Sequence, residues 1–409
     1  MYLSRVLAGI SFVLLACSAL ASEPLPSIAP EAVGLSAEKL QKIGDELRAD
    51  IERGRLPGAV VAIARRGKLA YFEAFGFRDK TAGAPMTTEA IFPLGSMSKA
   101  ITAVGALKLV EEGRLSLDDP VGKYLPALAN MPVAAKSADG SIDKVPAVRQ
   151  MTIRDLMRHS SGIPYGVAAG VYQLYQPLGF GASFPSDEFI ARLAELPLMQ
   201  QPGTTWEYGL SVEVLGVVIE KITQRALGDY LAESVFNPLG MDSTGFAWNA
   251  AKAERQAKPL PTNPDSGRPQ AALDPAKFRM ECGGACMTSS ARDYLRFAEM
   301  LLRKGQLENV RVLSPEMVQL LTSDQHRDVV KGFPQEGYTY GLGVAVRKGP
   351  VDPRFKGSPG RFFWNGLTGA SFWVEPREDL AVVVMTYAPG LFAEYHRKVN
   401  ALVLDAVMN

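Results

Sequence analysis

Apolar residues follow two different periodicities along the chain, and strand-like runs lie near both ends. In residues 36–53 apolar side chains recur at helical spacing behind Ser36, a good N-cap residue, so an amphipathic helix is expected there. Residues 58–77 hold two β-rich runs on either side of an Arg-Arg-Gly turn, which predicts a hairpin. Towards the other end of the chain, strands are expected at 340–349, 371–376 and 380–388, before a closing helix at 391–408.

The region between these strands has a mostly helical pattern. Helices are expected at 94–115, 152–164, 186–196, 211–225, 289–305 and 314–323. Residues 130–150 and 250–280 have the composition of loops and 237–246 that of a turn, and the glycine- and aromatic-rich segment 165–185 predicts an irregular wall or lid. This order favours an α+β fold, with an antiparallel sheet built from both chain ends and flanked by helices. An all-helical subdomain would be inserted at roughly residues 115–280.

The first 21 residues have the organisation of a secretory signal peptide. Arg5 supplies a positive charge, an apolar run follows, and Ala19-Leu20-Ala21 forms an A-x-A cleavage site. The apolar run is too short for a comfortable membrane span. We therefore expect a periplasmic or secreted protein with a single domain at 22–409. Lipidation at Cys17 is the alternative, although Leu15 fits the lipoprotein pattern poorly.

Charge and cysteine content exclude several classes of function. The chain has 44 Lys and Arg against 43 Asp and Glu, and the lack of a basic stripe argues against nucleic-acid binding. Three scattered histidines and the pair Cys282 and Cys286 do not make a metal site, so no metal or cofactor is expected. An oxidising compartment would permit a Cys282–Cys286 disulfide. The slightly favoured alternative is two small buried residues beside a glycine turn.

Three serines have a lysine three positions later, at Ser36, Ser96 and Ser141. The first pair opens a helix with a wide charged face, and the third lies in a loop-like stretch. Ser96 instead opens a helix that is apolar nearly all round after Lys99, which is typical of a buried helix. Burial would disfavour the ammonium form of Lys99 and let it take the Ser96 proton. A serine cap with a snorkelling lysine is the alternative, and this segment alone leaves the two open.

The wider sequence resembles the serine β-lactamase and penicillin-binding-protein superfamily over roughly residues 30–405. The motifs that carry the resemblance are "FPLGSMSKAITAVGALKLVEEGRLSLDDPVGKYLP", "TIRDLMRHSSGIP", "PGTTWEYGLSVEVLGVVIEKIT", "NPLGMDSTGF" and "GGACMTSSARDYLRFAEMLL". The resemblance implies a β-lactamase-like fold and a Ser96 nucleophile with Lys99 beside it. A Gly-x-Ser-x-Gly elbow is absent from the sequence, which argues against an α/β-hydrolase, and His159 matches a structural position of the superfamily.

The second and third motifs depart from the superfamily pattern. Tyr208-Gly209-Leu210 stands where Tyr-x-Asn is usual, and Trp364-Asn365-Gly366-Leu367 stands where Lys-Thr-Gly or His-x-Gly is usual. Both the amide and the cation that help to hold a β-lactam are therefore missing. The set is similar to that of the family VIII carboxylesterases. By that resemblance Tyr208 shares proton transfer with Lys99, Trp364 and Gly366 wall the pocket, and the Ser96 and Leu367 amides form the oxyanion hole.

The expected activity is that of a serine carboxylesterase, which hydrolyses small uncharged esters through a Ser96 acyl-enzyme. Which of Lys99 and Tyr208 takes the first proton stays open, as does the oligomeric state. One alternative is a β-lactamase or DD-peptidase-like enzyme that interacts with penicillins. A second is a non-catalytic binding relative of the same fold, and a third is amide or acyl-transfer chemistry with the same nucleophile.

Overall fold

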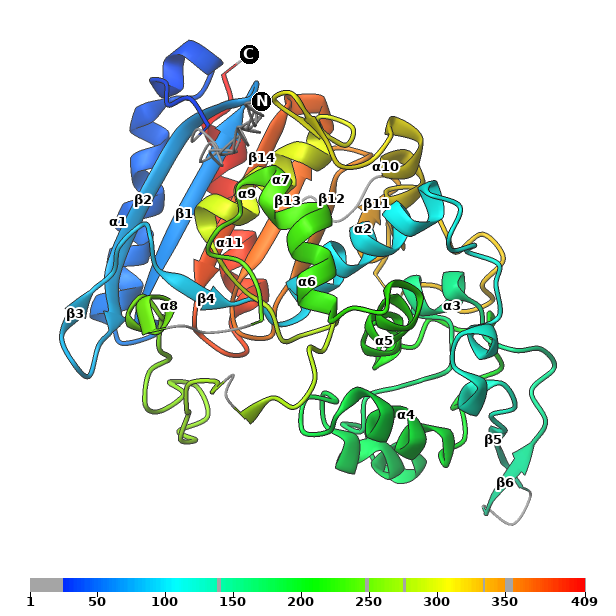
Figure 1. Cartoon of the computed structure of the whole chain (residues 1–409). Helices are drawn as coiled ribbons and strands as arrows, with labels where there is room; N and C mark the ends of the chain where they lie inside the picture. The colour runs from blue at the N-terminus through cyan, green and yellow to red at the C-terminus, as the bar shows by residue number, and fades with distance from the viewer. Residues whose placement is uncertain are drawn as a thin grey trace, which may run out of the picture.

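A central antiparallel sheet organises the molecule. The computed structural model describes residues 25–137, 141–246, 250–274, 277–333, 335–349 and 356–408. Eight strands form the sheet, in the order β10 (Tyr338–Tyr340), β11 (Ala345–Arg347), β12 (Phe362–Asn365), β13 (Ser371–Glu375), β14 (Leu380–Thr386), β1 (Gly58–Arg65), β2 (Lys68–Asp79) and β3 (Ala84–Pro85). Because β1 and β2 come from the start of the chain and β10–β14 from its end, the predicted sheet built from both chain ends is confirmed (Figure 1).

The two central strands are buried on both faces, which explains their continuous apolar sequences. In β1, Val60 and Ala62 belong to one hydrophobic core, and Val61 and Ile63 belong to the core on the opposite face. The strand β14 pairs with β1 through seven residue pairs and alternates in the same way. Each side of the sheet therefore has an apolar layer that a helix must cover.

Helices from distant parts of the chain cover the two faces. Helices α1 (Ala37–Glu52) and α11 (Phe392–Ala406) pack together over one face, and α9 (Ala291–Leu302) packs on β1 and β14 from the other (Figure 1). Helix α2 (Ser98–Glu111) belongs to the same core as α9. The two-stranded pair of β4 (Ile91–Pro93) and β7 (Thr288–Ser290) leads into α2 and α9, respectively.

The middle of the chain contains α3 (Ile153–Met157), α4 (Ser186–Ala194), α5 (Ser211–Thr223), α6 (Leu227–Leu231), the π-helical turn Ala232–Phe236, α7 (Asn237–Leu239) and α8 (Ala250–Glu254). It first runs away from the sheet, where α3, α4, β5 (Val133–Lys136) and β6 (Ile142–Val145) lie, and later returns to it with α7 beside α9 and α8 near β3 (Figure 1). Helix α10 (Pro315–Leu321) and the hairpin of β8 (Gln306–Leu307) and β9 (Val310–Arg311) follow β7 and α9.

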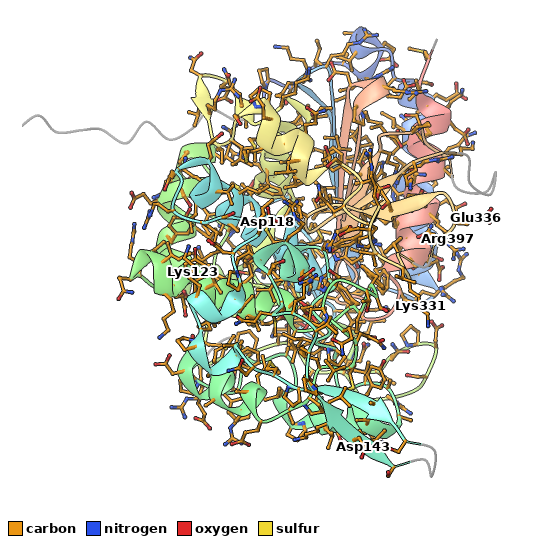
Figure 2. The ribbon with its side chains drawn as sticks, turned by 90° about the vertical axis from the view of Figure 1, so that its right-hand side faces the viewer. Asp118, Lys123, Asp143, Lys331, Glu336 and Arg397 are labelled. Carbon is orange, nitrogen blue, oxygen red and sulfur yellow. A yellow bond between two sulfur atoms is a disulfide. The ribbon has the colours of Figure 1, made fainter. Side chains whose placement is uncertain are left out.

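Three predictions for the middle region were wrong in detail. Residues 130–150 are not all loop, because β5 (Val133–Lys136) and β6 (Ile142–Val145) form a hairpin that ends the molecule near Asp143 (Figure 2). Strand β6 is mostly exposed, so its sequence lacks the alternation that marks a half-buried strand. Residues 250–280 open with the short helix α8 and are not all loop, and the predicted helix at 152–164 is only the short α3. The subdomain at 115–280 is therefore not purely helical.

No helix in the described part of the chain is long and apolar enough to cross a membrane. The predicted signal peptide and Cys17 lie outside the described residues.

Candidate active site

Ser96 lies at a sharp junction between a strand and a helix. Strand β4 runs into the 3₁₀ turn Gly95–Met97, and α2 begins at Ser98. Gly95 has a φ of +52°, a left-handed conformation that suits glycine. The N-cap of α2 is Met97, so Ser96 does not cap the helix with its side chain. The hydroxyl of Ser96 remains partly exposed at the start of a buried helix.

The fully buried Lys99 lies beside this serine. Its Nζ is 3.4 Å from the Oγ of Ser96, 2.9 Å from the hydroxyl of Tyr165 and 2.8 Å from the carbonyl oxygen of Gly284. It is also 4.9 Å from the centre of the Tyr208 ring. The buried lysine of the predicted pair is therefore in contact with its partly exposed serine.

The other two Ser-x-x-Lys pairs have ordinary structural roles. Ser36 caps α1 by accepting a hydrogen bond from the Lys39 amide, while the Lys39 ammonium donates to the Asp405 carbonyl. Lys144 donates to the Glu195 carbonyl at 3.4 Å. Ser36 is therefore a helix cap, whereas Ser96 is not.

Two hydrogen-bond partners of Lys99 determine which position on its Nζ atom faces Ser96. A carbonyl oxygen can only accept a hydrogen bond, so Gly284 takes one N–H of the lysine. The Tyr165 hydroxyl donates to the Oε1 of Glu213 at 3.4 Å and therefore accepts the second N–H. The third position on Nζ is left for Ser96. In the neutral amine this position is a lone pair, which is what a base needs.

Tyr165 and Glu213 are site residues that the sequence did not reveal. Burial holds the pKa of Tyr165 well above its ordinary value, and the charge of Glu213 acts in the same direction. Burial also raises the pKa of Glu213, although the nearby Lys99 charge opposes this. The Oε2 of Glu213 has no hydrogen-bond partner among the described residues. One signal was available: Glu213 is an acid in the otherwise apolar start of α5, an unusual place for an unpaired charge.

Tyr208 is placed at the loop–helix junction before α5, as expected. Its ring centre is 4.7 Å from that of His159, 5.5 Å from Tyr165, 5.7 Å from Trp206 and 5.6 Å from Trp364. Its hydroxyl accepts a hydrogen bond from the indole N–H of Trp364 at 3.4 Å. The second and third motifs therefore meet through an aromatic cluster, and Lys99 faces the Tyr208 ring.

His159 supports this cluster from behind. It is fully buried with a φ of +58°, and its carbonyl accepts a hydrogen bond from the Glu207 amide at 2.7 Å. Burial holds the pKa of His159 well below its ordinary value, and the charge of Lys99 lowers it further. The ring is therefore neutral at pH 7, in keeping with the structural role expected for this residue.

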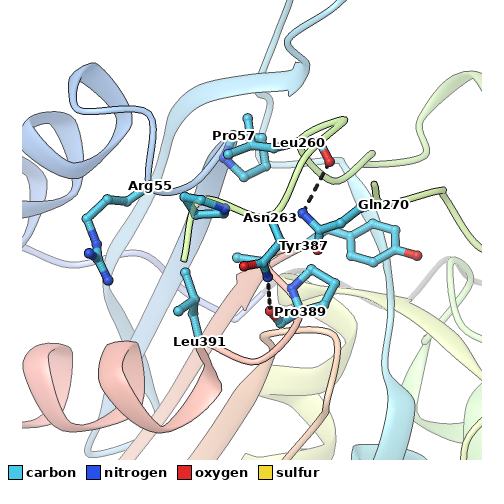
Figure 3. A pocket seen from close by; sticks show the side chains of 10 residues that line it. Arg55, Pro57, Leu260, Asn263, Gln270, Tyr387, Pro389 and Leu391 are labelled. Carbon is cyan, nitrogen blue, oxygen red and sulfur yellow. Dashed lines mark hydrogen bonds between the residues drawn. The ribbon is translucent and has the colours of Figure 1, made fainter. Parts of the chain in front are cut away.

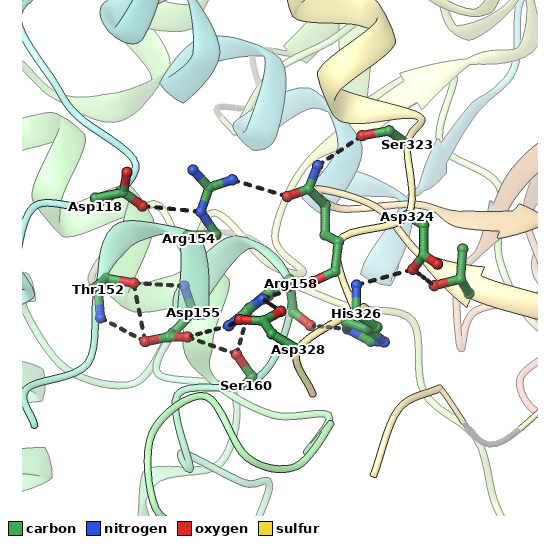
Figure 4. A network of polar contacts seen from close by, with 12 residues as sticks. Asp118, Thr152, Arg154, Asp155, Arg158, Ser160, Ser323, Asp324, His326 and Asp328 are labelled. Carbon is green, nitrogen blue, oxygen red and sulfur yellow. Dashed lines mark hydrogen bonds and ion pairs between the residues drawn. The ribbon is translucent and has the colours of Figure 1, made fainter. Parts of the chain in front are cut away.

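A buried polar network fixes the turn that carries His159 (Figure 4). Asp155 accepts hydrogen bonds from Arg149, Arg158 and Ser160 and from the amide of Thr152. Burial would raise the pKa of Asp155, but the hydrogen bond from Arg149 and the others outweigh it and keep the pKa below its usual value. Through Arg158, which also donates to the Gln325 carbonyl and to Asp328, the network ties the end of α3 to the 325–328 segment.

The third motif lies at the end of β12 and approaches the serine closely. A Cβ placed on Gly366 would come within 2.1 Å of the Leu94 carbonyl oxygen, and one on Gly95 within 3.3 Å of the Leu367 amide nitrogen. The Thr368 hydroxyl also donates to the Pro93 carbonyl at 2.7 Å. The structure therefore brings the Leu367 amide next to the Gly95–Ser96 segment. The need for glycine at 366 comes from contact with Leu94.

Cys282 and Cys286 form a disulfide, which corrects the slightly favoured prediction of two unpaired residues. Their Cα atoms are 5.2 Å apart, a separation that the glycine-rich loop between them allows. The carbonyl of Gly284, inside this loop, is the one that binds Lys99.

The predicted wall at 165–185 contains a 3₁₀ helix at Gly170–Leu178. Its Tyr175 hydroxyl donates to the Pro197 carbonyl at 2.9 Å, which anchors the segment. Phe180 packs edge-on against Tyr165 with 5.4 Å between ring centres and is 47% exposed. An apolar surface thus adjoins the side chain that holds Lys99.

A crevice elsewhere in the molecule does not belong to this site. The crevice in Figure 3, between Arg55, the 260–270 loop and the end of β14, has no room for a water molecule. No group of three or more His, Cys, Asp or Glu side chains that could hold a metal ion is found in the described ranges.

The chain is similar to known proteins over most of its length. A family model described as Beta-lactamase matches residues 42–405. An uncharacterized protein of Mycobacterium tuberculosis is 36% identical over 83% of this chain and 88% of its own. Esterase EstB of Burkholderia gladioli is 32% identical over 88% of this chain and 93% of its own. The solved structure of EstCE1, a hydrolase with promiscuous acyltransferase activity, superposes with a TM-score of 0.73 at 26% identity, over 90% of this chain and 98% of its own. The chain belongs to the beta-lactamase family of hydrolases.

Proposed function

We propose that the protein is a serine carboxylesterase that hydrolyses small uncharged esters through a Ser96 acyl-enzyme. The observation that carries the proposal is the contact of the buried Lys99 Nζ with the Ser96 Oγ, at 3.4 Å, with the two other Nζ partners both being acceptors. The similarity to esterase EstB over most of both chains supports the same reaction class.

In the proposed mechanism, neutral Lys99 takes the proton of Ser96 as its oxygen attacks the ester carbonyl. The amides of Ser96 and Leu367 hold the oxyanion. Tyr208, whose hydroxyl accepts a hydrogen bond from the Trp364 indole, then passes its proton to the departing alcohol and regains one from the Lys99 ammonium, so that both groups are reset. Water repeats the sequence on the acyl-enzyme and releases the acid.

The polarity around Tyr208 favours neutral substrates. Trp364 occupies the position where the superfamily carries a cation, and its N–H is directed to Tyr208. The apolar surface at Phe180 is proposed to hold the acyl or alcohol chain.

The decisive experiment compares the mature protein with Ser96→Ala. We expect p-nitrophenyl butyrate to be hydrolysed rapidly by the wild type and not by the variant, with an acyl adduct of Ser96 visible by intact-protein mass spectrometry. Ser36→Ala is the matched control, because it removes the serine of another Ser-x-x-Lys pair at a helix cap. A cost of about 1 kcal/mol in stability and no loss of turnover are expected for it.

Other outcomes would favour the alternatives. Hydrolysis of a chromogenic cephalosporin at rates that rival short esters would indicate a β-lactamase or DD-peptidase-like enzyme. A wild type that forms no adduct with esters or penicillin would indicate a non-catalytic relative. Ester formation with added alcohol in place of hydrolysis would indicate acyl transfer.

We also propose that the chain is exported, with cleavage after Ala21 and a single domain at 22–409. The Cys282–Cys286 disulfide supports an oxidising compartment. The mass of the protein purified from both the soluble and the membrane fractions of its native host tests this proposal. A lipid-modified Cys17 would contradict cleavage after Ala21.

A further inference from the structure

The disulfide loop lies directly against the lysine of the candidate active site. We propose that the Cys282–Cys286 disulfide is a positioning element for catalysis, which holds the Gly284 carbonyl in place as the acceptor that orients Lys99. This inference rests on the proposed function, since it concerns the same nucleophile and base. It assigns a role to the cystine that goes beyond general stabilisation.

Two consecutive carbonyls of the loop bind one face of α2. The Gly283 carbonyl accepts from the Thr102 hydroxyl at 2.7 Å, and the Gly284 carbonyl accepts from the Lys99 Nζ at 2.8 Å. Lys99 and Thr102 are three residues apart and therefore share a helix face. Thr102 fixes the loop against the helix one turn beyond the lysine, and all of these contacts are buried.

The other side of the loop packs closely against α5. A Cβ on Gly283 would come within 3.0 Å of the Val212 carbonyl oxygen, and one on Gly284 within 2.4 Å of the Oε1 of Glu213. A side chain at either position would therefore have to push its neighbour aside. Glycines give the backbone the most conformational freedom, so they also make the Gly284 carbonyl the easiest acceptor to displace.

The cystine removes that freedom. It closes a ring around the glycines and limits the conformations in which the Gly284 carbonyl can turn away from Lys99. The next residue, Met287, donates its amide to the Ser98 hydroxyl at 3.3 Å and accepts from the Leu94 amide at 2.9 Å. The C-terminal end of the loop is thus fixed to the segment that carries Ser96.

Burial indicates a permanent brace rather than a switch. Cys282 is fully buried and Cys286 is 5% exposed, so reductants in solution do not reach the sulfurs in the folded protein. Without residues 1–21 the chain has no further cysteine. Refolding can therefore produce either the dithiol or this one intramolecular disulfide, from an identical amino-acid sequence.

The test compares the oxidised and reduced forms of the mature chain. Protein refolded with dithiothreitol gives the dithiol. Because the folded protein shields these sulfurs, the dithiol is unfolded again and refolded with glutathione disulfide, which takes two electrons and two protons from the thiols, forms the cystine and leaves as two molecules of glutathione. The Cys282→Ala/Cys286→Ala double variant serves as a form that cannot reoxidise. Circular dichroism and the melting temperature identify folded samples, and only those are compared.

We expect kcat for p-nitrophenyl butyrate to fall about tenfold in the dithiol and in the double variant. This is the effect of losing one hydrogen bond to the base. The KM should stay within about twofold of the wild-type value. The rate of Ser96 labelling by a fluorophosphonate should fall by the same factor. Reoxidation should restore both kcat and the labelling rate in the refolded wild type. It should restore neither of them in the double variant.

Three outcomes would overturn the inference. One is a folded dithiol with unchanged kcat and labelling rate, and another is a loss that appears in KM alone. The third is a loss of kcat that reoxidation does not reverse. The labelling rate reads the reactivity of Ser96 without an ester substrate, so a failure of the proposed ester specificity would be seen separately, in the turnover of the oxidised wild type.

Discussion

Tyr165 offers the sharpest test of how Lys99 is held. Its hydroxyl accepts from the Lys99 Nζ at 2.9 Å and donates to the Oε1 of Glu213 at 3.4 Å. Tyr165→Phe removes this single oxygen and keeps the ring that packs against Phe180 and Tyr208. We expect a large loss of acylation rate, because one N–H of the lysine loses its acceptor and the lone pair is no longer directed at Ser96.

The size of the effect follows from the kind of bond that is lost. A buried hydrogen bond to a charged or charge-forming group contributes about 1.5–3 kcal/mol. At about 1.4 kcal/mol for each factor of ten, kcat/KM should fall about 10- to 150-fold. The loss should appear in kcat, since the ring that shapes the pocket is retained.

Tyr175→Phe is the matched control. It removes another buried tyrosine hydroxyl from the same segment, whose hydrogen bond to the Pro197 carbonyl is also 2.9 Å long. Steady-state hydrolysis of p-nitrophenyl butyrate and thermal unfolding are measured for both variants. Both should lose stability, and only Tyr165→Phe should lose activity. An equal loss of activity in the two variants, or a Tyr165→Phe rate within twofold of the wild type, would refute the reasoning.

Three further changes test other parts of the structure. Phe180→Ala should shift the preference among p-nitrophenyl acetate, butyrate and octanoate by about tenfold, since the apolar surface beside Tyr165 is lost; an unchanged chain-length profile would exclude this wall from the pocket. Burial raises the pKa of Glu299 to about 7, so the folded state holds its proton more tightly and the wild type loses stability as pH rises from about 4.5 to 7. Glu299→Gln should therefore raise the free energy of unfolding in urea by about 3 kcal/mol at pH 8 and by little at pH 4.5. A difference between variant and wild type that does not change with pH would contradict this prediction. Asp155→Asn should cost about 3–5 kcal/mol at pH 7. Because the pKa of Asp155 is held below its usual value in the folded state, the difference from the wild type should shrink only as pH falls below about 4, and a constant difference would contradict this origin.

The sheet was predictable because its central strands leave a strong signal in the sequence. Strands β1 and β14 are buried on both faces, so their residues are apolar without interruption. Helix α1 could be recognised from its periodicity and its Ser36 cap. The hairpin β5–β6 could not, because its strands pack on little and most of β6 is exposed. The hydrophobic pattern of a sequence reflects burial, so it is a poor predictor of elements that are not buried.

The same distinction applies to the site. Ser96 and Lys99 are three residues apart on one helix, so local spacing and an apolar environment predicted their contact. Tyr165 reaches Lys99 across 66 positions, and Gly284 reaches it across 185. Neither residue type indicates a role in catalysis, since tyrosine and glycine are common in irregular segments. Contacts of this kind follow from the packing of α2 against α5 and the disulfide loop, which spacing does not encode.

The order of the groups around Lys99 has a physical consequence. A carboxylate in direct contact with a lysine stabilises the ammonium form and removes its ability to act as a base. Glu213 is buried beside the site, but the Tyr165 hydroxyl stands between its Oε1 and the Lys99 Nζ. The direct partners of the amine are a phenol, a carbonyl and the nucleophile, all of them neutral. The protein therefore surrounds the Lys99 amine with neutral groups in its core, and this arrangement depends on the interposed tyrosine and on the carbonyl that the disulfide loop presents.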